Sequence, residues 1–167
     1  MVLRRSSERL TGRRSAIRNS LLFLCSCTLL AAPASAEIGR VKSTIGIATV
    51  ERGADKLPAT TGQQLMPGDW LETGKDGRMS VTFADNTRFA VGPDSRIELT
   101  KFEYDPTTEQ GAFVAKVERG SIAAVSGRIT KTRCGGQTGA PTCGMQIETP
   151  DSVLDVRGTR FIITVPR

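Results

Sequence analysis

Residues 148–161 read ETPDSVLDVRGTRF, and this stretch says most about the fold. Pro150 and Gly158 separate its short apolar runs, and both residue types interrupt regular secondary structure. The stretch therefore predicts a strand, a turn at Pro150, a second strand, a sharp turn at Gly158 and a third strand.

A charged residue, Arg157, lies at the apolar end of this stretch. Because an unpaired buried charge is very costly, an arginine in such a place usually needs a fixed partner. We expect Arg157 to pair with Asp155, with Asp69 or with a backbone carbonyl. The alternative is that its guanidinium group binds an anionic ligand. Gly158 is expected to supply a backbone conformation that other residues resist, and Thr159 to form a local hydrogen bond.

The same pattern of short alternating runs and turns continues through the rest of residues 37–167. Apolar and polar residues alternate with a period of two, which is typical of strands with one face in water. No window in this part has the apolar stripe of a helix. We therefore predict an all-β fold in which short antiparallel or solenoid-like strands form a single β-sandwich or a β-helix-like domain. Gly120 is expected to interrupt one of the strands.

The first 36 residues have the organisation of a secretory signal peptide. Residues 1–20 carry six arginines against one glutamate, residues 21–32 read LLFLCSCTLLAA, and an Ala-Ser-Ala site ends at Ala36. This order predicts cleavage between Ala36 and Glu37. The apolar run is too short to span a bilayer, which takes about 20 residues. An uncleaved anchor, a lipoprotein and export by the twin-arginine route remain as alternatives.

Removal of this segment changes the charge of the chain. The whole sequence has a net charge of +6, and residues 1–36 contribute six arginines minus one glutamate, which leaves +1 for residues 37–167. A nearly balanced chain with no run of Lys or Arg gives no support for nucleic-acid binding.

Removal of the signal also leaves two of the four cysteines, Cys134 and Cys143, which flank a Gly-rich segment. In an exported protein such a pair predicts a disulfide. A zinc site is the alternative, but structural zinc sites usually take four Cys or His ligands and the chain has no histidine.

The absence of histidine also excludes nucleophile pairs of the Ser-His and Cys-His kinds. Asp69, which follows Gly68, could serve as a metal-binding or catalytic carboxylate. An aspartate at such a turn more often accepts hydrogen bonds from the backbone. A hydrolase with paired carboxylates remains formally open. We predict no enzymatic activity, and no motif indicates a cofactor.

Several motifs, in this order and spacing, resemble the FecR-like periplasmic domain family. They are LMPGDWLETG at residues 65–74, GRMSVTFAD at 77–85, GSI at 120–122 and the opening stretch at 148–161. The similarity covers roughly residues 38–165. It implies an all-β periplasmic domain in which the motif residues have structural roles; these residues are Gly68, Asp69, Arg157, Gly158 and Thr159.

The best-known members of this family are sensors with a cytoplasmic anti-sigma segment and a membrane helix. Only about 20 residues precede the apolar run here, so we expect an exported member without that segment and without a membrane span after cleavage. The resemblance implies a non-catalytic periplasmic or secreted module that binds an envelope protein or polymer. The alternatives are a structural envelope component that docks by an open sheet edge, and a membrane-anchored sigma-factor regulator.

Overall fold

The computed structural model describes residues 37–131 and 144–166, and within them the chain forms twelve strands and one short 3-10 helix. The all-β prediction is confirmed. The elements are β1 (Gly39–Ile45), β2 (Ala48–Arg52), β3 (Asp55–Pro58), β4 (Gln64–Leu65), β5 (Trp70–Thr73), β6 (Arg78–Phe83), β7 (Arg88–Val91), β8 (Arg96–Asp105), β9 (Gln110–Val125), η1 (Ile129–Lys131), β10 (Gly144–Glu148), β11 (Val153–Val156) and β12 (Arg160–Val165).

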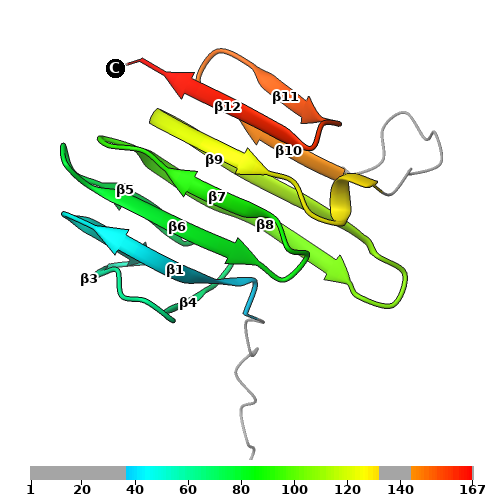
Figure 1. Ribbon diagram of the computed structural model, residues 1–167, viewed down its shortest axis with the longest axis horizontal. Coiled ribbons are helices and arrows are strands. Elements are labelled where there is room, and N and C mark those ends of the chain that lie inside the picture. The colour runs from blue at the N-terminus through cyan, green and yellow to red at the C-terminus, as the bar shows by residue number, and fades with distance from the viewer. Residues whose placement is uncertain (1–36, 132–143, 167) are drawn as a thin grey trace, which may run out of the picture. The chain divides into compact units, whose positions relative to one another are not determined.

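The strands form one continuous sheet that curls into two facing layers (Figure 1). The front layer has the strand order β4-β1-β6-β7-β9-β12, and the back layer has the order β3-β2-β5-β8-β9-β10-β11. Every ladder is antiparallel except the one between β9 and β10. A β-helix stacks parallel strands, so of the two predicted architectures the chain adopts the sandwich-like one.

Strand β9 belongs to both layers. Its first part, up to Arg119, pairs with β8, and its last part pairs with β7 and β12. The change occurs at Gly120, whose φ of 88° is a conformation that favours glycine. The expectation that Gly120 interrupts a strand was wrong. Because it has no side chain, it lets one strand fold from one layer onto the other.

Alternating apolar side chains from both layers fill the space between them, as the period of two predicts. Four phenylalanines form the centre, and the ring centroids of their contacting pairs lie 4.6 to 5.8 Å apart. Phe83 and Phe89 come from the front layer, while Phe102 and Phe113 come from the back layer. The phenylalanines therefore hold the two layers together.

The stretch at residues 148–161 folds as predicted, into the end of β10, a turn, β11, a second turn and the start of β12. The expected burial of Arg157 was wrong. Its side chain is exposed, and it forms no ion pair with any residue that the structure describes. Asp69 instead pairs with Arg52, and Asp155 accepts a hydrogen bond from Gln146. The turn points the arginine into water, where a charge needs no partner.

Within residues 37–131 and 144–166, no helix has the length and apolar character needed to cross a membrane.

Candidate binding site

Gly68 and Asp69 end a tight turn that leads into β5. Pro67 and Gly68 occupy its central positions, Gly68 has a φ of 86°, and the N–H of Asp69 donates to the carbonyl of Met66. The Asp69 carboxylate is fully buried. It accepts two hydrogen bonds of 2.7 Å from the guanidinium group of Arg52 and one of 2.8 Å from the N–H of Met66. These bonds engage both oxygens in holding the turn against Arg52 of β2.

Gly158 and Thr159 tie the last turn to the end of β9. The hydroxyl of Ser126 donates to the carbonyl of Gly158 at 2.7 Å, and the N–H of Ser126 donates to the carbonyl of Thr159 at 2.9 Å. Both contacts are structural. Cys134, Cys143 and Ala36 lie outside the described residues, so the predicted disulfide and signal cleavage, just before Glu37, stay predictions.

A second buried carboxylate, Asp85, organises the turn between β6 and β7. It accepts hydrogen bonds from the N–H and the hydroxyl of Thr87 at 2.9 and 2.6 Å. Its backbone carbonyl accepts from the N–H of Arg128 at 2.9 Å, and the Thr87 hydroxyl accepts from the N–H of Gly127. Asp85 therefore anchors the segment that leads into η1.

The outer face of the back layer neutralises its own charges. Glu72 accepts hydrogen bonds from Lys56, from Arg119 at 2.9 Å and from Arg96 at 3.4 Å. The hydrogen bond from Lys56, followed by the charges of Lys56, Arg96 and Arg119, holds the pKa of Glu72 below its usual value against the opposing effect of burial. Arg96 also lies 4.5 Å from the ring centroid of Trp70. The charged groups of this face thus stabilise one another.

The outer face of the front layer has the opposite character. No strand of this layer contains an aspartate or a glutamate within its layer residues. Apart from Arg40, which pairs with Glu37, the exposed cations of the face form no ion pair with any residue of the described ranges. These free cations are Lys42, Arg78, Arg88 and Arg160.

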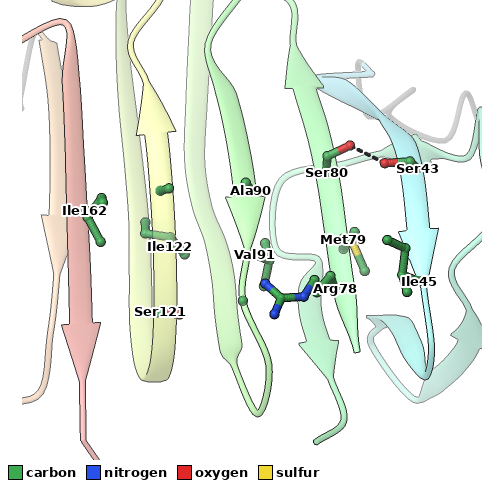
Figure 2. A pocket seen from close by; sticks show the side chains of 12 residues that line it. Ser43, Ile45, Arg78, Met79, Ser80, Ala90, Val91, Ser121, Ile122 and Ile162 are labelled. Atoms are coloured by element: carbon green, nitrogen blue, oxygen red, sulfur yellow. Dashed lines mark hydrogen bonds between the residues drawn. The ribbon is translucent and has the colours of Figure 1, made fainter. Parts of the chain in front are cut away.

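A row of side chains, most of them small, crosses this face from strand to strand. The register pairs Ser43 with Ser80, Ser80 with Ala90, Ala90 with Ala123 and Ala123 with Ile162. Figure 2 shows Ser43, Ser80, Ala90 and Ile162 of this row on their strands, with the hydroxyls of Ser43 and Ser80 joined by a hydrogen bond of 2.7 Å. The small side chains let a ligand approach the sheet closely.

Two adjoining hollows lie along this row, with volumes of about 250 and 790 Å³. Both are lined by Ser80, Ala90, Ala123 and Ile162. We call this combined depression the front groove. Its free cations are Arg78 in the smaller hollow, and Lys42, Arg88 and Arg160 in the larger one.

The cations stand on both sides of the groove floor. Arg88 and Arg160 are both cross-strand partners of Val125, so they lie in one row, two strands apart. Arg78 lies on the other side, because Arg88 pairs with Thr82 and Arg78 is four residues away from Thr82 along β6. A ligand on the floor therefore has positive charge on both sides.

Sequence reasoning missed this site. The net charge of +1 for residues 37–167 hides a strong segregation, in which carboxylates are confined to the back layer, the turns and the N-terminal lead-in. Within the described ranges, no group of three or more His, Cys, Asp and Glu side chains is placed to hold a metal ion. The geometry favours binding through cations, hydroxyls and close contact with small side chains.

Comparison with known proteins assigns the chain to a family. The family model described as FecR protein matches residues 69–166, which is more than half of the chain. The chain belongs to the FecR family. FecR membership fits an envelope-associated module.

A solved structure described as a cell surface anchoring domain is 27% identical, with a TM-score of 0.37, and the alignment covers 39% of this chain and 87% of that chain. The TM-score is too low to indicate a common fold. No curated protein matches this FecR chain significantly.

Proposed function

We propose that this FecR protein is a non-catalytic, exported binding module that holds an anionic protein or polymer of the periplasm or cell envelope in its front groove. One observation carries the proposal: the strands of the front layer contribute free cations and no carboxylate, whereas in the back layer Lys56, Arg96 and Arg119 all pair with Glu72. A surface of one sign of charge attracts a partner of the opposite sign.

The shape of the face supports the same function. Ala90 and Ala123 are exposed in the middle of the sheet, and Ile162 is 76% exposed at one end of the row. Small residues at the centre with an apolar residue at the rim provide contact area, while the surrounding guanidinium groups provide orientation through their fixed donor geometry.

The test measures binding of the exported protein to isolated envelope fractions by co-sedimentation at increasing salt concentration. The variant Arg88→Ala/Arg160→Ala removes two cations of the groove. Its matched control is Lys75→Ala/Lys101→Ala, which removes the same charge from a turn and from the back layer. Loss of two charged contacts should weaken binding by about tenfold or more, since about 1.4 kcal/mol is a factor of ten.

We expect salt-sensitive binding that the groove variant loses and the control keeps. Equal binding of the two variants would place the binding surface elsewhere. Absence of binding to every fraction by the unmodified protein would contradict the proposed function itself.

A second function, docking of a partner strand as part of a larger assembly, is favoured by the edge of the front layer. Within the described residues, β12 pairs only with β9, and it carries the exposed Ile162. An unpaired apolar edge can accept a strand from another chain. Substitution Ile162→Asp should abolish such docking, whereas Ile45→Asp, in β1 on the far side of the front groove, should leave it intact.

A further inference from the structure

We propose that the ligand of the front groove is a linear acidic polysaccharide that lies across the strands, with acidic groups spaced about 10 Å apart. This inference rests on the proposed function and names the chemical class of its ligand.

The spread of the cations requires an extended ligand. Arg78 lies four residues from Thr82, the cross-strand partner of Arg88, and four residues of a strand span about 13 Å. The cations also extend from Lys42 on β1 to Arg160 on β12, which is too far for one carboxylate or phosphate group to contact them all. A small anion would therefore use only part of the site.

The direction of the groove follows from its floor. The row from Ser43 through Ala90 to Ile162 crosses β1, β6, β7, β9 and β12, and Lys42 lies beside its β1 end. Lys42 falls where the register between β1 and β6 shifts, and such irregularities redirect side chains. A chain on this floor runs perpendicular to the strands and meets cations along its length.

The spacing of the cations fits a glycan better than an extended peptide. Arg88 and Arg160 are separated by two strand spacings, or about 10 Å, which is close to the length of two sugar units in an extended polysaccharide. Side chains on one face of an extended peptide recur about every 6.8 Å. A glycan with one acidic group per disaccharide therefore matches the row.

The backbone of the floor also disfavours a peptide. Strands β6, β7 and the last part of β9 each have neighbours on both sides, so their hydrogen-bonding groups face one another. A peptide gains much of its affinity from main-chain bonds at a free edge, and these three central strands of the floor have none. The hydroxyls of Ser43 and Ser80 retain capacity beyond their mutual hydrogen bond and suit the hydroxyls of a sugar.

The test uses a fluorescein-labelled hyaluronan oligosaccharide, which carries one carboxylate per disaccharide, and follows fluorescence anisotropy with the exported protein. We expect salt-sensitive binding whose Kd rises at least tenfold in Arg88→Ala/Arg160→Ala. It should rise similarly in Ala90→Phe, which fills the floor without changing charge. Lys75→Ala/Lys101→Ala should bind as the unmodified protein does.

Poly-glutamate, single-stranded DNA and vesicles of anionic phospholipid serve as competing probes. Equal or tighter binding of any of them would overturn the assignment to a glycan. An unchanged Kd in Ala90→Phe would also overturn it, because the oligosaccharide would then bind without using the groove floor. Failure to bind hyaluronan while the groove variant still loses envelope binding would overturn the glycan alone and leave the proposed function intact.

Discussion

Replacement of Gly120 by alanine tests how β9 joins the two layers. A Cβ atom at Gly120 would lie 2.2 Å from Oγ, 2.4 Å from Cα and 2.6 Å from Cβ of Ser95. Ser95 is fully buried, and its hydroxyl accepts a hydrogen bond of 2.9 Å from the N–H of Ser121. The new methyl group therefore cannot enter without moving the start of β8 or the bend of β9.

The loss of folding free energy in Gly120→Ala has two parts. A non-glycine residue at a positive φ costs about 1–2 kcal/mol, and forcing an extra carbon into a packed site costs about 1–3 kcal/mol. We expect Gly120→Ala to lower the free energy of unfolding by about 2–5 kcal/mol. Gly68 is the matched control, because its φ of 86° is nearly the same and a Cβ there would meet no atom within 4 Å. Gly68→Ala should cost only about 1–2 kcal/mol, the conformational part.

Urea denaturation followed by circular dichroism measures both variants against the unmodified protein. The predicted result is a larger loss for Gly120→Ala than for Gly68→Ala, with the difference equal to the packing cost. Equal losses in the two variants would refute the reasoning, because they would mean that the bend at Gly120 has room for a side chain.

Three further predictions concern charge and processing. Glu72→Gln should lower the free energy of unfolding by about 1 kcal/mol at neutral pH. Folding lowers the pKa of Glu72, so the difference between the two proteins should be present above the ordinary glutamate pKa. Unfolding curves measured in acid should show this difference vanish as the pH falls through the folded-state pKa. N-terminal sequencing of the exported protein should begin at Glu37, and a start at Met1 would contradict the predicted signal peptide. Mass spectrometry without reductant should show Cys134 and Cys143 linked, whereas labelling of both by a thiol reagent would contradict the disulfide.

The fold was predictable where strands alternate and turns are marked by glycine, proline or aspartate. β6 shows this, because Met79, Val81 and Phe83 point into the core and a turn follows at Asp85 and Asn86. The strands β3 and β4 were not predicted as separate elements. β3 is exposed at all four positions and β4 has only two residues, so neither carries a readable alternation.

The environment of Arg157 could not be read from its neighbours in sequence. Val153 and Leu154 suggested a buried strand, but they are 61% and 40% exposed in β11, which pairs only with β10 among the described strands. An edge strand has a neighbouring strand on one side only, so its apolar side chains stay partly exposed to water. The inference from local hydrophobicity to a buried, paired arginine failed for this reason.

The binding site was hidden for a different reason. Which strands share a layer depends on long-range pairing, as in the contact of Arg88 with Val125 and of Val125 with Arg160. These residues are far apart in sequence and none belongs to a basic run. Only the folded sheet places the free cations on one face whose strands contain no carboxylate.

Site-specific photo-crosslinking in living cells tests the central claim most directly, that the outer face of the front layer is the binding surface. A benzophenone side chain is placed at Ile45 or Ile162, which are exposed at the two ends of the front groove and leave its floor of small residues unfilled, and at Thr100, which is exposed in the back layer. Benzophenone reacts with C–H bonds of proteins and glycans alike. The account predicts a discrete adduct from both groove positions and none from Thr100; an adduct from Thr100 alone would contradict it.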